Sequence, residues 1–240
     1  MRKNVYMSKV FVIPDVHLKP WMFEKASHFV EKAPYDAVVL LGDLVDDWYQ
    51  EKNIELYNET FDAAIAFTSK HKDTFWCYGN HDVSYLWEEY ESGYSAYARD
   101  TVVRRIAELE ASIPPENSAF IHRFDNTLFS HAGLTRDFVL RVFNYGNQDL
   151  STMIANINKM TSDELWRNDS PIWVRPQFGR MEIYSGGVLQ VVGHTPVKCV
   201  LQEGNLLTLD IFSTYREGGA IGDERFVWID TVKKTWEYVV

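Results

Sequence analysis

Cysteine is nearly absent from this chain of 240 residues, which holds only Cys77 and Cys199. Two cysteines are too few for a disulfide framework, and both lie in apolar runs where a buried thiol is the ordinary interpretation. Long apolar runs are missing as well. No window approaches the ~18 residues needed to span a bilayer, and residues 1–8 show no apolar stretch behind their charges. We therefore expect a cytoplasmic protein without an export signal or a membrane partner.

Basic side chains are outnumbered by acidic ones. The sequence has 24 Lys and Arg against 34 Asp and Glu, which gives a formal net charge of −10. A molecule of this charge attracts neither phosphate backbones nor anionic lipids, so we expect no stable nucleic-acid complex. Internal repeats and linkers rich in Gly, Ser and Pro are also missing, which predicts one domain over residues 1–240. The oligomeric state is left open by the sequence.

Apolar and aromatic residues are abundant. Hydrophobic residues make up 46% of the chain, with 14 Phe, 8 Trp and 13 Tyr, which excludes a disordered, collagen-like or coiled-coil protein. Short β-branched or aromatic runs alternate with helical patterns around 54–65 and 97–113. Strands are expected at 9–14, 37–41, 74–78, 127–130, 188–192, 206–212, 226–229 and 235–240. The last three have no helical pattern between them, which favours a mixed or antiparallel sheet at the end of the chain.

Two long segments are predicted to be insertions. Residues 83–126 and 134–187 look mostly helical or irregular, and we expect them to select the substrate because loops commonly carry specificity. The first contains an aromatic-rich stretch over residues 85–97, which packs into the core or, as the alternative, forms a stacking platform.

A polar cluster follows each of the first five predicted strands. In chain order the clusters read DVH (15–17), GDLVD (42–46), GNHD (79–82), SHAG (130–133) and GHTP (193–196). If the first strand stays extended, the spacing of two places Asp15 and His17 on one face. In open α/β sheets, ligands bind beyond the carboxyl ends of the strands, so five such clusters predict one shared site.

The donors in these clusters are carboxylate, amide and imidazole groups, with no thiolate. Six of them are candidate metal ligands: Asp15, His17, Asp43, Asn80, His131 and His194. This mixture of donors suits Mn, Fe or Zn better than Ca or Cu(I). Six groups exceed one tetrahedral zinc site but would hold two adjacent divalent cations with a bridging carboxylate. Mn is the first expectation, with Fe or Zn as alternatives.

In this order, the five clusters resemble the pattern D-x-H, G-D-x-x-D, G-N-H-(D/E), H-x-G and G-H of the calcineurin-like metallophosphoesterase superfamily. The resemblance covers roughly residues 9–230. It implies an α/β sandwich in which two mixed β-sheets pack together and are flanked by helices. It also implies a metal-dependent phosphoric ester hydrolase, in which a hydroxide between the two cations attacks phosphorus.

The resemblance also implies a role for each matching residue. Asp43 would bridge the two metals. One metal would be held by Asp15, His17 and Asp43, and the other by Asp43, Asn80, His131 and His194. His81 would be catalytic, giving a proton to the leaving oxygen, and Asp46 would orient it. His28, His71 and His122 lie outside the five clusters and are expected to have ordinary structural roles.

Within the superfamily, the strings GDLVD, SHAGL and LWR are similar to the phosphoprotein phosphatase branch, which includes serine/threonine phosphatases and symmetrical diadenosine tetraphosphatases. That branch favours phosphomonoesters or phosphoanhydrides, so the expected substrate is a phosphorylated protein or a nucleotide. Nucleases and many phosphodiesterases instead end in G-H-x-H, and Pro196 stands at that last position here.

The chain departs from the branch at its phosphate-binding arginine. The pattern G-D-x-V-D-R-G continues here as Asp47-Trp48, so another cation has to bind the phosphate. Arg167 is the first candidate, after a capping box that predicts a short helix from Thr161, and Arg175 is the second. Asn80 is expected to contact the substrate too.

Two other functions stay open at this point. The missing arginine favours a phosphodiesterase or nuclease with the same dimetal site, because a diester carries one fewer charge. A catalytically inactive binding module is opposed by the retention of every expected ligand.

Overall fold

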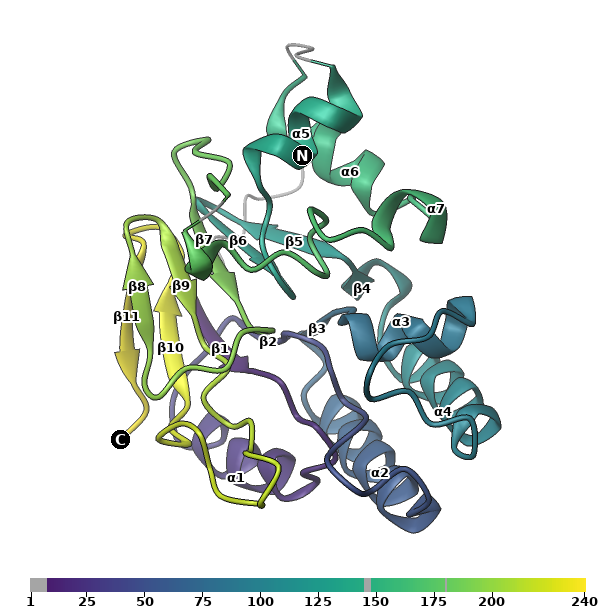
Figure 1. Cartoon of the computed structure of the whole chain (residues 1–240). Helices are drawn as coiled ribbons and strands as arrows, with labels where there is room; N and C mark the ends of the chain where they lie inside the picture. Colours follow the sequence, from purple (N-terminus) through teal and green to yellow (C-terminus); the bar gives the residue numbers. More distant parts are fainter. Residues whose placement is uncertain (1–7, 145–147, 180) are drawn as a thin grey trace.

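The computed structural model describes residues 8–144, 148–179 and 181–240. Two mixed β-sheets pack together, with α1 to α4 on one outer side and α5 to α7 on the other (Figure 1). This arrangement confirms the expected sandwich of two mixed sheets flanked by helices. Among the described residues, no helix is long and apolar enough to cross a membrane.

The first sheet has six strands in the order β11-β10-β1-β2-β3-β4. Its strands are β1 (Lys9–Ile13), β2 (Ala37–Leu40), β3 (Thr74–Cys77), β4 (Ser118–Ala119), β10 (Val227–Asp230) and β11 (Thr235–Tyr238). The strands β1 to β4 run parallel, whereas β10 pairs antiparallel with both β1 and β11. The carboxyl ends of β1, β2 and β3 therefore lie at the same edge of this sheet.

The second sheet has five strands in the order β5-β6-β7-β9-β8. Its strands are β5 (Ile121–Phe124), β6 (Thr127–Ser130), β7 (Leu189–Val192), β8 (Leu201–Glu203) and β9 (Leu206–Thr208). The central strands β6, β7 and β9 are parallel, and the edge strands β5 and β8 are antiparallel to their neighbours. The residues that follow β6, β7 and β9 are thereby brought to one edge.

The helices are α1 (Trp21–Val30), α2 (Ile54–Lys70), α3 (Asn80–Trp87), α4 (Arg99–Ser112), α5 (Arg136–Phe143), α6 (Leu150–Ile157) and α7 (Ser162–Leu165), with 3₁₀ turns at Pro115–Asn117 and Pro176–Phe178. Two of the helices, α2 and α4, cover the helical patterns expected around 54–65 and 97–113. The backbone N–H of Thr161 donates to the Glu164 carboxylate at 3.0 Å, which confirms the capping box before α7.

Side-chain alternation along β1 divides the core. Phe11 and Ile13 pack with the helices on the outer face, whereas Val10 and Val12 pack between the two sheets. A third apolar cluster joins the outer face of the second sheet to α5 and α6. Burial on both faces fixes the register of β1, because a slip of one residue would exchange its two faces.

Three short strands were not expected from the sequence. The strand β4 has only two residues, β5 carries a histidine and an arginine, and all three residues of β8 are exposed, so none shows an apolar run. Because β4 and β5 belong to different sheets, residues 83–126 include the passage of the chain from one sheet to the other as well as α4.

Candidate active site

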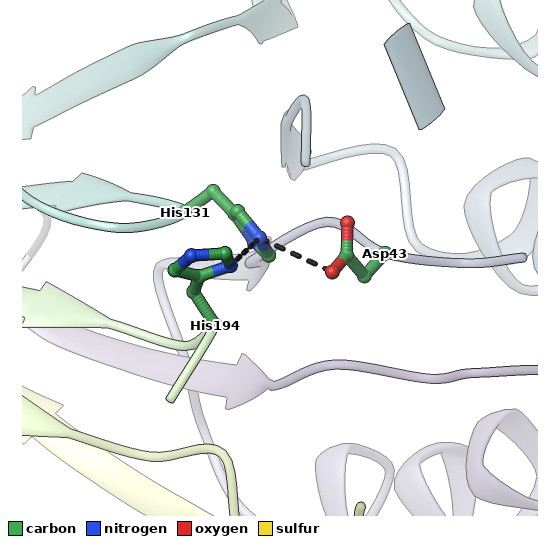
Figure 2. A group of neighbouring side chains, drawn as sticks. All are labelled: Asp43, His131 and His194. Carbon is green, nitrogen blue, oxygen red and sulfur yellow. Dashed lines mark hydrogen bonds and ion pairs between the residues drawn. The ribbon is translucent and has the colours of Figure 1, made fainter. Parts of the chain in front are cut away.

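Residues that follow four strands meet at one point. His131 Nε2 lies 3.2 Å from Asp43 Oδ2, 2.9 Å from Asn80 Oδ1 and 3.1 Å from His194 Nδ1. Figure 2 shows the imidazoles of His131 and His194 turned toward each other, with the Asp43 carboxylate facing the same ring nitrogen. Asp43 and Asn80 come from the first sheet, and the two histidines follow β6 and β7 of the second.

The other nitrogen of each ring is already engaged. His131 Nδ1 lies 2.8 Å from the Leu41 carbonyl oxygen, and His194 Nε2 lies 3.0 Å from the Trp173 carbonyl oxygen. A carbonyl can only accept, so these nitrogens donate. When the rings are neutral, the lone pairs of His131 Nε2 and His194 Nδ1 therefore face the carboxylate and amide oxygens. Four acceptors facing one another require a positive charge between them, which fits a metal cation.

A second group of acceptors adjoins the first through Asp43. Ligand atoms of Asp15, His17 and Asp43 all lie within 4.8 Å of one another. His17 Nδ1 donates to the Asp46 carbonyl oxygen at 2.8 Å, which leaves His17 Nε2 directed at Asp43 Oδ2, 3.8 Å away. Asp15 Oδ2 is buried and has no hydrogen-bond partner among the described residues. An unpartnered buried carboxylate oxygen fits a second cation at this position.

The charges of these groups agree with a demand for cations. Burial, more than any other cause, raises the pKa of Asp15 well above its ordinary value. Burial lowers the pKa of His131, but Asp43 outweighs it and raises that pKa to about 9. Burial and the neighbouring His131 hold the pKa of His194 well below its ordinary value, so its imidazole is neutral. The carboxylates thus attract positive charge to His131 Nε2, the atom that faces the other acceptors.

The backbone around the site adopts conformations that side chains seldom favour. His17, Asp43, Asp46 and His194 have φ values of 44°, 49°, 65° and 62°, in the left-handed region. Such residues cost about 1–3 kcal/mol each and persist where the surrounding structure holds them. The expected extended path from Asp15 to His17 is therefore wrong. The N–H groups of residues 16 and 17 both donate to the Asp43 carbonyl oxygen, which turns the chain and brings the His17 ring to Asp43.

Close backbone approach explains two glycines of the clusters. A Cβ atom at Gly79 would lie 2.1 Å from Asp43 Oδ1, and one at Gly193 would lie 2.0 Å from Asp15 Oδ2. Any larger residue at either position would displace a candidate metal ligand.

Asp82 connects the loops that follow β2 and β3. Its carboxylate accepts from the backbone N–H groups of Asp43, Leu44 and Gly79, each at 2.9 Å. These bonds hold the Asp43 backbone against the start of α3, which is why a short carboxylate serves at this position.

His81 is the second residue of α3 and lies beside the acceptor groups. Its backbone N–H donates to Asp43 Oδ1 at 3.0 Å, and its ring Nδ1 lies 3.0 Å from Asp46 Oδ2. Burial lowers the pKa of His81, but Asp43, Asp46 and Glu91 outweigh burial and raise it well above its ordinary value. The structure therefore places the predicted pair of His81 and Asp46 together, with an imidazolium favoured at neutral pH.

Asp46 is held from its other side by two tyrosines. Asp46 Oδ1 accepts from the Tyr57 hydroxyl at 2.8 Å and from the Tyr85 hydroxyl at 2.6 Å. Both tyrosine rings are fully buried in the first sheet's helix layer. These bonds fix the carboxylate plane and leave Oδ2 for His81.

The two candidate arginines differ in their surroundings. Arg175 donates through Nη1 to the His194 carbonyl oxygen and to Thr195 Oγ1, and it is partly buried. Arg167 is exposed and follows α7, and its Nε donates to the Asp163 carbonyl oxygen of that helix at 3.2 Å. The structure thus brings Arg175 to a candidate metal ligand, whereas the described contacts of Arg167 are local.

Several residues near the site were missed by sequence reasoning. Glu91 Oε1 lies 3.1 Å from His81 Nδ1, and Asp210, which follows β9, is buried with Oδ1 unpartnered among the described residues. Asp47 pairs with Lys19, whose Nζ lies 3.5 Å away, and accepts from Thr214 Oγ1 at 3.1 Å. Asp210 lies inside the predicted strand 206–212, whereas β9 ends at Thr208, so no predicted strand end pointed to it.

Residues expected to be structural lie away from these groups. His122 Nε2 lies 3.1 Å from the Trp76 carbonyl oxygen, and His71 Nδ1 lies 2.9 Å from the Tyr35 hydroxyl. In the aromatic stretch over residues 85–97, Tyr85 is buried, whereas Tyr90 and Tyr97 are exposed. The expectation that both cysteines are buried is wrong for Cys199, which is exposed.

Comparison with known families decides what this arrangement is. Residues 8–218 match the family model of calcineurin-like phosphoesterases. The chain belongs to the calcineurin-like phosphoesterase family. This finding confirms the resemblance drawn from the five clusters. The protein is thus a metal-dependent phosphoesterase that acts on phosphorylated substrates, with clusters of residues able to hold metal.

Several solved structures are similar to this chain at low sequence identity. A protein serine/threonine phosphatase from Saccharomyces cerevisiae with similarity to human phosphatase PP5 matches with a TM-score of 0.53 at 16% identity, over 95% of this chain and 74% of that chain. A metallophosphoesterase from Sphaerobacter thermophilus has a TM-score of 0.43 at 13% identity, over 97% and 88% of the two chains. An archaeal phosphodiesterase has a TM-score of 0.40 at 9% identity, over 97% and 99%. Among curated proteins, none matches the sequence.

Proposed function

We propose that this phosphoesterase is a two-metal phosphatase that hydrolyses phosphomonoesters or phosphoanhydrides. Its substrate would be a phosphorylated protein or a nucleotide such as a dinucleoside polyphosphate. The observation that carries the proposal is the position of His81, whose backbone binds Asp43 and whose ring is held by Asp46. A positioned proton donor gains most where the leaving group is a poor one, such as the alkoxide of a serine or threonine ester.

The metal ligands are proposed in two sets that share Asp43. One set is Asp15, His17 and Asp43, and the other is Asp43, Asn80, His131 and His194. We propose Mn as the native metal, with Fe or Zn as alternatives, because the donors are oxygen and imidazole nitrogen. Two bound cations would supply an activated water and positive charge for the phosphoryl oxygens. The mutually facing acceptors and the unpartnered Asp15 Oδ2 support these assignments.

The protein's own groups have separate tasks in the proposed reaction. His81 gives a proton to the leaving oxygen through Nε2, since Nδ1 is engaged by Asp46. Asp46 orients the ring and stabilises its charge, and the hydroxyls of Tyr57 and Tyr85 hold that carboxylate in place. Asn80 offers its amide nitrogen to a phosphoryl oxygen, because Oδ1 faces His131.

A cation for the substrate phosphate is also needed, because Asp47 replaces the arginine of the related phosphatases. Arg175 is favoured over Arg167 by its contact with the His194 carbonyl oxygen and its partial burial. A guanidinium can bind two phosphate oxygens at once, which makes such a residue a specific clamp. Arg167 stays the second candidate.

A phosphodiesterase or nuclease is the second candidate function. It is favoured by Asp47, whose carboxylate pairs with Lys19 and so reduces the positive charge available to a dianionic monoester. A diester carries one fewer charge and needs that clamp less.

The proposed function includes a cellular location and a class of partner. We place the enzyme in the cytoplasm, because Cys199 is an exposed free thiol that a reducing compartment preserves. The formal net charge of −10 supports a small or protein-borne phosphate group as substrate and no stable nucleic-acid complex.

The test compares an aryl phosphomonoester with its diester counterpart, using protein stripped of metal and reloaded with Mn. A strong preference for the monoester is expected. A preference for the diester would overturn the phosphatase assignment in favour of the phosphodiesterase. Binding of two metals without turnover of either substrate would leave the inactive binding module as the better account.

A further inference from the structure

Two carboxylates face the same nitrogen of His81. Asp46 Oδ2 lies 3.0 Å from His81 Nδ1, and Glu91 Oε1 lies 3.1 Å from it. Asp46 belongs to the loop after β2, whereas Glu91 belongs to the loop between α3 and α4. The ring is therefore held by two separate segments, and its Nδ1 edge is engaged on both sides.

The carboxylate of Glu91 is itself buried and oriented. Only 4% of its side chain is exposed. Its Oε2 accepts from the Gly93 backbone N–H at 2.9 Å, while Oε1 has no hydrogen-bond partner of its own among the described residues and faces His81. Burying a carboxylate is costly unless it is compensated, so this placement is unfavourable unless the imidazole is there to meet it. Glu91 is built into the site and differs in this from an ordinary acidic surface residue.

Gly93 brings the same loop directly against the ring. A Cβ atom at this position would lie 2.6 Å from His81 Cε1 and 2.9 Å from Nδ1. The backbone of residue 93 thus forms a wall on which the imidazole rests. A side chain there would push the ring or the loop away.

The loop is also fixed to Asp46 by a path that avoids His81. The backbone N–H of Ser95 donates to the Tyr85 hydroxyl at 2.8 Å, and that hydroxyl donates to Asp46 at 2.6 Å. Two residues of one loop therefore act on the two partners, Glu91 on the imidazole and Ser95 on the carboxylate. This double connection sets the position of the loop relative to the ring.

We propose that Glu91 is a positioning residue of the proton-donating step: with Asp46, it holds the His81 ring so that Nε2 faces the leaving oxygen. In that step a water oxygen bonds to phosphorus, the bond from phosphorus to the leaving oxygen breaks, and the proton passes from Nε2 to that leaving oxygen. His81 becomes neutral, and both carboxylates keep their charge. The inference rests on the proposed function, because it assigns Glu91 to the step performed by His81.

The experiment measures kcat and KM of the Mn-loaded full chain on phenyl phosphate, a poor leaving group, and 4-nitrophenyl phosphate, a good one. Glu91→Ala should lower kcat on phenyl phosphate about tenfold, as part of the 10²–10⁴-fold that a positioned acid contributes. The KM, the content of two metals and the kcat on 4-nitrophenyl phosphate should change little. Glu91→Gln keeps an oxygen opposite Nδ1 and should restore part of the loss.

A second variant tests the position without removing the carboxylate, although the added Cβ would also lie 3.1 Å from Glu91 Oε1. Gly93→Ala adds one methyl group against the ring and should reproduce the selective loss on phenyl phosphate. Glu89→Gln is the matched control, because it makes the same chemical change in the same loop, outside the cluster of Asp46, His81 and Glu91. It should behave like the unaltered protein on both substrates.

The outcomes separate the inference from the function on which it rests. Equal rates for Glu91→Ala and the unaltered protein on phenyl phosphate would overturn the positioning role. An equal loss on both substrates, accompanied by loss of metal, would also overturn it and indicate a merely structural role. If the unaltered protein cleaves neither monoester, the phosphatase assignment itself fails, and the role of Glu91 fails with it.

Discussion

Two neighbouring clusters of buried carboxylates and imidazoles differ in what completes them. Around His131, nitrogen and oxygen atoms of four side chains face one another, and the N–H group on the other side of each ring donates to a carbonyl oxygen outside the cluster. Around His81, the Asp46 carboxylate accepts hydrogen bonds from the His81 ring nitrogen and from two tyrosine hydroxyls. Similar side chains therefore form a candidate cation site in one place and a hydrogen-bonded group in the other, according to where their protons point.

Asp43 belongs to both clusters. Its Oδ2 faces His131 and His17, while its Oδ1 accepts from the His81 backbone N–H. This division between two oxygens places the proposed proton donor beside a proposed metal ligand without the two competing for the same atom. Variants that remove one cluster and leave the other intact should therefore have different effects on metal content and on turnover.

The largest effect is expected from His131→Ala. The variant should bind one metal in place of two and lose activity by about a thousandfold or more, because a cation supplies several kcal/mol of transition-state stabilisation. Asn80→Ala should give the same metal loss. Metal content measured by elemental analysis checks this, with exposed His28→Ala as the control. Retention of two metals in either ligand variant would contradict the assignment.

His81→Ala should remove the imidazole of the second cluster and leave the first cluster intact. We expect two bound metals and a turnover reduced by 10²–10⁴-fold, the usual contribution of a general acid. The loss should grow as the leaving group becomes poorer, because only proton donation is removed. Rates across a series of aryl phosphates measure this, and a loss independent of the leaving group would speak against the assigned role.

Arg175→Ala should weaken substrate binding and change neither cluster much. Its KM for a phosphomonoester should rise about tenfold, since a hydrogen bond to a charged group contributes about 1.5–3 kcal/mol. Arg167→Ala is the matched variant and should give a smaller increase in KM, because the Arg167 side chain donates to the neighbouring Asp163 carbonyl oxygen of α7. The reverse order in steady-state kinetics would return the phosphate clamp to Arg167.

His122 provides a buried imidazole with neither metal nor carboxylate. Burial lowers the pKa of His122 to about 4, whereas an unfolded histidine titrates near pH 6.5. Above pH 6.5, His122 is neutral in both the folded and the unfolded protein. Between pH 6.5 and 4, His122 binds a proton only in the unfolded chain. The free energy of unfolding should therefore fall by up to about 1.4 kcal/mol per pH unit between pH 6.5 and 4. Denaturant unfolding of His122→Gln should show a shallower fall than the unaltered protein, with His28→Gln as control.

The sequence predicted the candidate ligands because each lies within a few residues of a strand end. Strands made of short apolar runs, such as β1 and β2, could be recognised from composition alone. The backbone turn at His17 could not, because it depends on hydrogen bonds to the Asp43 carbonyl oxygen far along the chain. Local sequence patterns therefore predict which residues lie at the site, but they do not predict the backbone conformation that places them there.

Residues that act from loops escaped prediction for a related reason. Glu91 stands in the acidic run Glu88-Glu89-Tyr90-Glu91, where nothing local distinguishes it from its neighbours. Its role depends on how the loop folds against His81. Arg175 ranked below Arg167 in the sequence because family spacing favoured the latter, and the course of the chain after α7 places Arg175 beside His194.

The sharing of ligands between the two sheets has a thermodynamic consequence. Asp15 and Asp43 follow strands of the first sheet, and His131 and His194 follow strands of the second. Any cation held between them cross-links the two halves of the sandwich, so its binding free energy adds to the free energy of unfolding. The metal-loaded protein should therefore survive proteolysis longer than the same protein stripped of metal.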